Sequence, residues 1–327
     1  MSDKLNFGIV GTNFISDAFV KAAKLSEKCK TVAVYSRTKE KGEAFAKKHG
    51  IPLVYTSFDE MLDSEELDAV YIASPTFLHK EMAVKALQKG KHALIEKMIS
   101  INFSEFLEIK KAMENSSAIF LEAMRPDFDR TFEIIEENLS KIGKIKEVSL
   151  EFRQYSSRYD NFKRGIVENA FNPSIKNSAL SDIGIYPLHL AVRLFGEPID
   201  TSAKSHFLEN GFEAEGELSL LYPDFSVNIS YSKIFEGKNI SFIKGERGTI
   251  SFGKINAPNS FSVVIDGKET VLDFTAEENN MLSEINAFCD TVRGEKKYLR
   301  FIDVSKKTLL LVDKIYEKAG IRFPLRV

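Results

Sequence analysis

Two clusters of polar residues have types and positions that could carry out acid–base chemistry. The first is Glu96-Lys97, which follows directly on the apolar run His92–Ile95. Charges at the end of a buried strand are costly unless they are paired or functional. A lysine in such a place can have its pKa lowered by desolvation and can act as an acid or base near neutral pH. The alternative is a strand-end lysine that simply reaches solvent.

The second cluster consists of Asp182, Tyr186 and His189. Their spacing of four and then three residues puts them on one face of a helix predicted over Ser181–Phe195. Pro187 either lies near the first turn of this helix or kinks it. Taken alone, the spacing is more often that of an ordinary polar helix face than of a catalytic one.

A third feature, at the start of the chain, could bind phosphate. Leu5–Val10 reads as a short apolar strand, Gly11 opens a tight turn, and helical spacing begins at Asn13 or Phe14. Free N–H groups and the helix dipole at such a turn favour a pyrophosphate. The fingerprint G-x-G-x-x-G is partly present: Asn13, which tolerates unusual backbone angles, takes the second glycine's place, and the small Ser16 takes the third. The candidate cofactor contacts here are Gly11, Thr12, Asn13, Phe14 and Ile15.

The first 120 or so residues alternate between strand and helix, which predicts a doubly wound parallel sheet of class α/β. Strands are predicted at Leu5–Val10, Thr31–Ser36, Val54–Tyr55, Asp68–Ala73, His92–Ile95 and Ala118–Leu121, with five intervening helices. Ligands bind such sheets beyond the carboxyl ends of the strands. Those ends are Gly11, Ser36-Arg37, Ser74-Pro75-Thr76 and Glu96-Lys97.

The end of the second predicted strand bears on the choice of cofactor. An acidic residue there would bind the ribose hydroxyl of NAD, whereas an arginine can accommodate the 2′-phosphate of NADP. The sequence has Ser36, Arg37 and Thr38 at this place. A guanidinium can hydrogen-bond a phosphate in bidentate fashion. These residues predict NADP(H), with NAD(H) less favoured; the alternative is a surface arginine.

From residue 123 onward the pattern changes to that of a second domain. Residues 156–178 are polar and irregular, and a loop of that length is uncommon unless it is functional or a lid. Residues 199–274 alternate as seven strands, with Asp266-Gly267 a strong hairpin turn. Helices at Ala276–Val292 and Asp303–Ala319 follow. The prediction is a first domain over residues 1–122, and over 123–327 an α+β domain with a large, mainly antiparallel open sheet.

The chain resembles the Gfo/Idh/MocA oxidoreductases, and nearest to it is the dihydrodiol dehydrogenase branch. The matching blocks are Gly8–Thr12, Leu67–Pro75, His79, Gly90–Lys97 and Asp182–Pro187. Asn13 and Thr76 depart from the family's pattern, as does Met98, which stands where Glu-Lys is usually followed by proline. The resemblance implies a Rossmann domain in which Lys97 lies beside the nicotinamide. It also implies that Ser74, Thr76 and His79 line the cofactor cleft, and that Asp182 and Tyr186 reach the reacting carbon.

The predicted function is therefore NADP-dependent hydride transfer between the nicotinamide and a hydroxyl or carbonyl carbon of a sugar, polyol or dihydrodiol. Lys97 and Tyr186 would handle the hydroxyl proton, and Asp182 would orient one of them. Glu96 is added to the cofactor contacts, and Arg125, Tyr155 and His189 to the substrate contacts. Two alternatives stay open: a non-catalytic NADP(H)-binding sensor or scaffold, and a cofactor-recycling glycosidase or epimerase-like enzyme.

Composition gives no reason to expect other kinds of partner. The chain has 327 residues and a net charge of −2, which argues against nucleic acid or an anionic membrane surface. No apolar run or leader suggests a membrane span or a secretory signal, and Cys29 and Cys289 have no metal or redox spacing. We expect a cytoplasmic protein without a metal. We also expect a homodimer through the second sheet, with Leu218, Leu220 and Tyr222 on its outer face, or else their neighbours on the opposite register.

Overall fold

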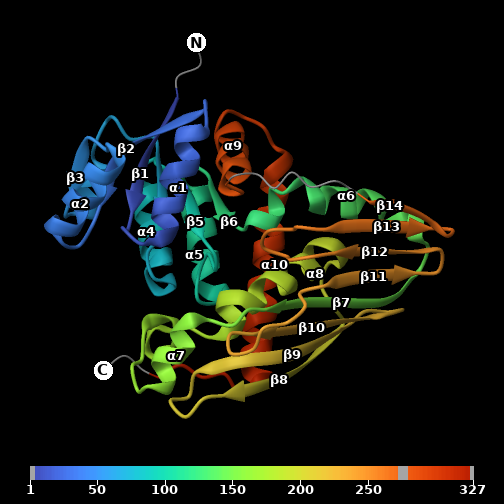
Figure 1. The fold of residues 1–327 in the computed structure, drawn as a ribbon. Helices are drawn as coiled ribbons and strands as arrows, with labels where there is room; N and C mark the ends of the chain where they lie inside the picture. Colours follow the sequence, from blue (N-terminus) through green and yellow to red (C-terminus); the bar gives the residue numbers. More distant parts are fainter. Residues whose placement is uncertain (1–3, 272–278, 325–327) are drawn as a thin grey trace. The chain divides into compact units, whose positions relative to one another are not determined.

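The computed structural model describes residues 4–271 and 279–324. Contacts within the chain divide it into two compact units (Figure 1). The first is Met1–Phe128 together with Glu277–Ser305, and the second is Asp129–Ala276 together with Lys306–Val327. The boundary predicted after residue 122 thus falls inside the first unit, and a C-terminal segment predicted in the second domain groups with the first.

The first unit contains a six-stranded sheet in the order β3-β2-β1-β4-β5-β6, with every pair of neighbours parallel. The chain order reverses between β1 and β4, which is the switch point where such sheets bind ligands. The strands are β1 (Leu5–Val10), β2 (Cys29–Tyr35), β3 (Leu53–Tyr55), β4 (Ala69–Ile72), β5 (His92–Glu96) and β6 (Phe120–Ala123). The doubly wound parallel sheet is confirmed.

Five helices alternate with these strands: α1 (Phe14–Leu25), α2 (Lys39–His49), α3 (Phe58–Leu62), α4 (His79–Gln88) and α5 (Phe103–Glu114). Short 3₁₀ turns lie at Thr76–Leu78 and Arg125–Asp127. Each long helix buries one apolar stripe against the sheet. In α1 the stripe includes Phe19, whose ring stacks on Tyr71 of β4 with centroids 3.8 Å apart.

Helix α9 (Met281–Val292) belongs to the first unit, and side chains of this helix and of Asn279, shortly before it, bind elements near the N-terminus. Asn279 donates its side-chain amide to the Ala18 carbonyl oxygen at 2.8 Å, and Lys28 forms a 2.6 Å ion pair with Asp290. The start of the predicted helix, residues 276–278, lies outside the described residues. A 3₁₀ turn at Lys297–Leu299 leads to α10 (Arg300–Ala319), which belongs to the second unit from Lys306 onward.

The second unit contains an eight-stranded sheet in the order β14-β13-β12-β11-β7-β10-β9-β8. Among the described strands of this second sheet, β10 and β7 are the one pair that is parallel, so the prediction of a mainly antiparallel sheet is confirmed. The strands are β7 (Ile145–Arg153), β8 (Asp200–Phe207), β9 (Glu213–Leu221), β10 (Ser226–Ser232), β11 (Ser241–Gly245), β12 (Gly248–Phe252), β13 (Phe261–Ile265) and β14 (Lys268–Val271). The last predicted strand runs to residue 274, and its final three residues lie outside the described ones.

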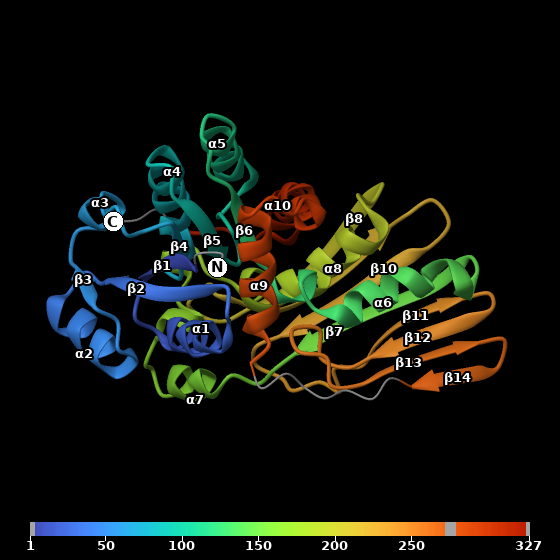
Figure 2. The ribbon, with the colours of Figure 1, turned by 90° about the horizontal axis from the view of Figure 1, so that it is seen from above.

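Helices α6 (Arg130–Leu139) and α8 (Ile185–Phe195) cover one face of this sheet (Figure 2). A 3₁₀ turn at Ser140–Ile142 follows α6. Leu218, Leu220 and Tyr222 are buried, so the first of the two registers expected for the outer face is wrong. Their neighbours on the opposite register, including Glu217 and Leu221, are exposed instead.

Residues 156–178 are not an irregular loop. They contain α7 (Ser157–Lys163) and two 3₁₀ turns, Asn169–Phe171 and Pro173–Ile175. Phe162 and Phe171 form a buried cluster with Phe212, which directly precedes β9, and Ala214, which lies in β9. The aromatic residues within the polar stretch account for this order, because their burial offsets the entropy lost on fixing the segment.

Candidate active site

Gly11 forms a tight turn at the end of β1 that only glycine fits. Its φ is +101°, and a Cβ there would lie 3.1 Å from the carbonyl oxygen of Ala73, at the end of β4. Both observations describe a backbone that comes unusually close to its neighbour. A cradle of this kind lets a ligand phosphate approach the main chain at the start of α1, which fits a dinucleotide.

Asn13 has ordinary extended angles, with φ −86° and ψ −177°, so its tolerance of unusual angles is not what this position requires. Its value lies in its side chain. The amide oxygen accepts hydrogen bonds from the N–H groups of Ile15 and Ser16 at 3.0 and 3.1 Å, which caps α1. The amide nitrogen donates to the Ala73 carbonyl oxygen at 2.8 Å, which ties the turn to β4. Thr12 is half-buried, and Phe14 and its neighbour Asn13 are exposed.

The end of β2 presents an exposed cation. Ser36 is buried, its N–H donates to the Tyr55 carbonyl oxygen at 3.0 Å, and its hydroxyl oxygen lies 3.4 Å from the Thr38 nitrogen. Arg37 and Thr38 are exposed. No ion pair holds Arg37 within the part of the chain that the structure describes. Its guanidinium can therefore meet an anionic ligand without first breaking a salt bridge.

His79 joins the ends of β4 and β5. It is only 1% exposed, with its Nδ1 2.8 Å from the Met98 carbonyl oxygen and its Nε2 2.8 Å from the Ser74 carbonyl oxygen. A neutral imidazole can donate to only one of these two oxygens. Burial lowers the pKa of His79, while the two carbonyl groups raise it. Both ring nitrogens are engaged by the main chain, and the half-buried Ser74 and Thr76 lie beside them.

Lys97 lies immediately after β5, half-buried, at the predicted strand end. The peptide bond between Lys97 and Met98 is cis, although residue 98 is not proline. The next N–H, of Ile99, donates to Glu122 Oε1 at 3.0 Å, and Glu122 Oε2 accepts from the Ser305 hydroxyl at 2.5 Å. The main chain after the lysine is thus tied to β6.

Glu96 and Arg125 contact other groups inside the first unit. The buried Glu96 carboxylate accepts a hydrogen bond from the Tyr71 hydroxyl, and Arg125 lies 3.4 Å from the side-chain oxygen of Asn280. Burial raises the pKa of Glu284 to about 8, with the charge of Glu96 adding to the rise and that of Arg125 opposing it. Glu284 was not singled out from sequence, although its place in the apolar stripe of α9 marks it as buried.

Asp182 begins the second cluster, in the π-helical turn Leu180–Gly184 that precedes α8. The regular helix predicted from Ser181 therefore starts only at Ile185, and Pro187 lies in its first turn, where its missing N–H costs little. A Cβ on Gly184 would lie 2.8 Å from the ring of Tyr231, so this turn lies against the sheet.

Tyr186 and His189 are both buried in the second unit. The ring of Tyr186 packs edge-on against Phe152 at 5.6 Å, and His189 Nδ1 lies 3.5 Å from the Thr308 hydroxyl of α10. Tyr155 is at the edge of exposure and donates its hydroxyl to Asp160 at 2.7 Å. The substrate contacts predicted at Arg125, Tyr155 and His189 stay predictions.

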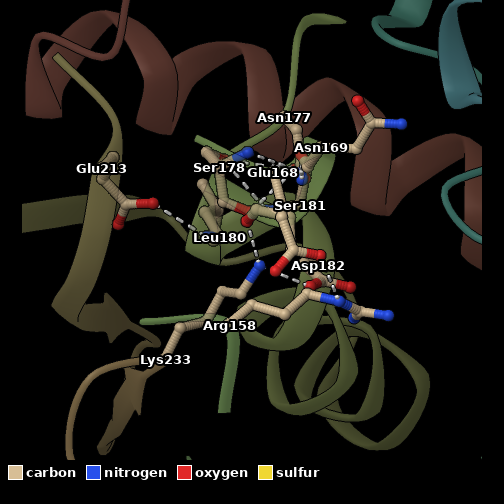
Figure 3. Close-up of polar contacts among 11 residues, drawn as sticks. Arg158, Glu168, Asn169, Asn177, Ser178, Leu180, Ser181, Asp182, Glu213 and Lys233 are labelled. Carbon is tan, nitrogen blue, oxygen red and sulfur yellow. Dashed lines mark hydrogen bonds and ion pairs between the residues drawn. The ribbon is translucent and has the colours of Figure 1, made fainter. Parts of the chain in front are cut away.

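Two buried ionisable residues hold the Asp182 turn, and neither was singled out from sequence. Lys233 Nζ is 2.7 Å from Asp182 Oδ2, and Glu213 accepts a hydrogen bond from the Leu180 N–H at 2.9 Å (Figure 3). Burial raises the pKa of Glu213 to about 7. Lys233 could have been found, because it occupies an inward position of the alternating run Val227, Ile229, Tyr231.

Comparison with known families accounts for both units. Residues 5–123 match the model of the oxidoreductase family with an NAD-binding Rossmann fold, and residues 133–251 match the Gfo/Idh/MocA C-terminal domain. The chain belongs to the Gfo/Idh/MocA oxidoreductases. The predictions of the family, of an enzyme of the dehydrogenase kind and of a nicotinamide dinucleotide cofactor are thereby confirmed.

Relatives match over nearly the whole chain. The scyllo-inositol 2-dehydrogenase (NADP(+)) of Bacillus subtilis is 35% identical over 323 residues, covering 98% of each sequence. The trans-1,2-dihydrobenzene-1,2-diol dehydrogenase of Xenopus laevis is 29% identical and covers 97% of this chain and 99% of its own. A solved 3-ketoreductase from Actinomadura kijaniata, in complex with NADP, is 18% identical, with a TM-score of 0.85 over 97% of this chain and 98% of its own, which supports the fold.

No helix among residues 4–271 and 279–324 is both long and apolar enough to cross a bilayer. Within the same ranges, no three His, Cys, Asp or Glu side chains form a group that could hold a metal ion.

Proposed function

We propose that the protein is an NADP-dependent dehydrogenase that oxidises a ring hydroxyl of a cyclic polyol or sugar, or reduces the corresponding ketone. The observation that carries the proposal is the position of Lys97, a half-buried lysine at the carboxyl end of β5 in a sheet with a phosphate cradle at Gly11. The scyllo-inositol dehydrogenase relative supports a polyol, and the dihydrodiol dehydrogenase relatives support a cyclic diol as second choice.

NADP is proposed over NAD because of the charge at the end of β2. Arg37 is exposed, and Ser36 and Thr38 flank it where a carboxylate would exclude the 2′-phosphate. An arginine fork can make two charge-assisted hydrogen bonds to that phosphate. Gly11 and the N-terminus of α1 would hold the pyrophosphate.

The proposed residue roles follow the chemistry of alcohol oxidation. The nicotinamide, when bound, supplies the hydride acceptor. As the C–H bond of the substrate breaks, its hydroxyl proton passes to Lys97 in the neutral amine form or to Tyr186, and the C–O bond gains double-bond character. Asp182 orients the group that takes the proton. In the reductive direction the same lysine or tyrosine returns the proton to the oxygen.

A substrate panel tests this function. The purified protein is mixed with NADP⁺ or NAD⁺ and with scyllo-inositol, myo-inositol, glucose or a trans-dihydrodiol, and the formation of the reduced cofactor is followed by fluorescence. Turnover of a polyol with NADP⁺ is the expected result. Binding of NADPH without turnover of any compound would favour a sensor, and product formation without net change in NADP would favour a cofactor-recycling enzyme.

We further propose a homodimer formed through the outer face of the second sheet. This face carries Arg153 and Lys204 beside Glu217, around a groove of about 390 Å³. Mixed charges of this kind can pair with a two-fold related copy of themselves. Sedimentation at micromolar concentration should give a dimer, and Lys204→Glu together with Arg153→Glu should give monomers. A wild-type monomer under these conditions would contradict the proposal.

A further inference from the structure

Lys233 is a buried lysine at the carboxyl end of β10. Its relative exposure is only 3%, and its N–H donates to the Ala214 carbonyl oxygen at 2.9 Å, which continues the strand pairing by one residue. A buried ammonium is costly unless its charge is paired and its N–H groups are hydrogen-bonded. The groups around the Lys233 Nζ atom therefore indicate what this lysine does in the protein.

Among the residues that the structure describes, four groups surround the Nζ atom. It lies 2.7 Å from Asp182 Oδ2 and 2.5 Å from the Ala170 carbonyl oxygen. It also lies 4.9 and 5.2 Å from the ring centroids of Phe171 and Phe212, within the range of a cation–π contact. Two oxygens and two aromatic faces fix the ammonium in place from several sides.

The two members of this ion pair differ in exposure. The side chain of Lys233 is 4% exposed, whereas that of Asp182 is 37% exposed. The lysine is thus closed in by the protein, while the carboxylate stays accessible to a molecule from outside. Figure 3 shows the lysine reaching toward Asp182 from the strand side.

The main chain of the same turn is held separately. The Glu213 carboxylate accepts from the Leu180 N–H, and the Ser181 hydroxyl accepts from the Ser178 N–H at 2.9 Å. These bonds fix where the turn lies. The contact with Lys233 is made by the Asp182 carboxylate itself, so it bears on the direction and the charge of that group.

We propose that Lys233 is a positioning residue that holds the Asp182 carboxylate in one orientation. The proposal rests on the proposed function, in which Asp182 orients the group that takes the hydroxyl proton. With one oxygen against the ammonium, Asp182 acts as a fixed hydrogen-bond acceptor and not as a proton carrier. Misplacing a catalytic group by about 1 Å can cost on the order of 100-fold in rate.

Kinetics of five variants test this role. Lys233→Met should lower kcat by about 10- to 100-fold on this scale and leave NADPH affinity unchanged. Lys233→Arg, which keeps the charge, should recover a large part of the loss. Lys238→Met, an exposed lysine nearby, is the matched control and should behave as wild type. Adding Lys233→Met to Asp182→Asn should cause little further loss of kcat, because the two residues act as one unit.

Additive losses in the double variant, or wild-type kcat in a folded Lys233→Met protein, would overturn the proposal. If Lys233→Met alone does not fold, the double variant removes both charges and supplies the comparison. A crystal structure of Lys233→Met gives a measurement that needs no substrate: the Asp182 carboxylate should leave its wild-type position. An unmoved carboxylate would overturn positioning, whereas a wild type without turnover would overturn the proposed function and leave this structural result standing.

Discussion

The end of β5 and the Asp182 turn are held in place by different kinds of interaction. Around Lys97 they include contacts to the main chain: the two ring nitrogens of His79 lie 2.8 Å from the carbonyl oxygens of Met98 and Ser74, and Glu122 accepts from the N–H of Ile99. Around Asp182 they are contacts of buried ionisable side chains, Lys233 and Glu213. The position of the first region follows from the topology of the parallel sheet. The second depends on a few charges, each of which a single substitution can remove.

The largest effect is expected from substituting Lys97, which should remove the catalytic activity without unfolding the protein. Lys97→Met keeps similar bulk but removes the transferable proton, and His79 and Glu122 still hold the main chain around this position. We expect normal folding and NADPH binding but a fall in kcat of at least about 100-fold, since positioned acid–base groups contribute 10² to 10⁴-fold. Steady-state kinetics on the substrate found by the panel, with NADPH titration alongside, measure both.

Lys89→Met, an exposed lysine before β5, is the control for loss of a surface charge. Tyr186→Phe separates the two candidate proton donors: a comparable loss would make the tyrosine the principal one, and a smaller loss would leave that role to Lys97. Near-normal turnover in Lys97→Met would place the acid–base chemistry elsewhere.

The second effect concerns cofactor choice, which belongs wholly to the first unit. Arg37→Asp should weaken NADPH binding by roughly tenfold to a hundredfold, the equivalent of about 1.5–3 kcal/mol for a charge-assisted contact. NADH binding should be equal or better, because the new carboxylate can accept from the ribose hydroxyl. Fluorescence titration of both cofactors gives the ratio. Lys41→Asp, the same charge change on exposed α2, controls for long-range electrostatics, and unchanged NADPH affinity in Arg37→Asp would show that Arg37 does not contact the phosphate.

The sequence predicted the first region well because its signals are local. Apolar runs of strand length end at Gly11, Ser36, Ser74 and Lys97, and parallel topology brings such ends to one edge of the sheet. The sequence did not reveal which side chains in this region form hydrogen bonds that hold the main chain in place. Asn13 was expected to tolerate strain and instead caps α1, and the carbonyl partners of His79 come from two loops that no local pattern brings together.

The second region was harder to predict because its decisive residues depend on register. The pairing of β8 with β9 shifts between His206 and Phe207, so Glu213 pairs with Phe207 and is buried next to the equally buried Ala214. A bulge of this kind turns a side chain to the other face of the sheet, and alternation alone would have left Glu213 in solvent. Lys233, by contrast, keeps the alternation of β10 and was open to prediction.

The smallest expected effect is on the pH dependence of the free energy of unfolding, to which one buried glutamate in each unit contributes. Glu284 in the first unit is fully buried and has no hydrogen-bond partner for either carboxylate oxygen among the described residues, whereas Glu213 in the second accepts from Leu180. Burial raises the pKa of Glu284 from 4.5 to about 8 and that of Glu213 from 4.5 to about 7. Between these limits the folded protein keeps a proton that the unfolded chain has released. The contribution of these two groups to the free energy of unfolding therefore falls as pH rises through each window and is greatest below 4.5.

Glu284→Gln should remove the part of this decrease in the free energy of unfolding that Glu284 causes, because the amide stays neutral at every pH. From pH 6 to pH 7 one titrating proton is worth about 1.4 kcal/mol at most, so the variant should lose stability more slowly than wild type by about 1 kcal/mol over that interval. Glu213→Gln should flatten the curve less, because the window of Glu213 closes near pH 7. Urea denaturation at both pH values measures the slopes, with the exposed Glu65→Gln as control. If Glu284→Gln kept the wild-type slope, Glu284 would be ionised in the folded protein, and Arg125 rather than a retained proton would balance its charge.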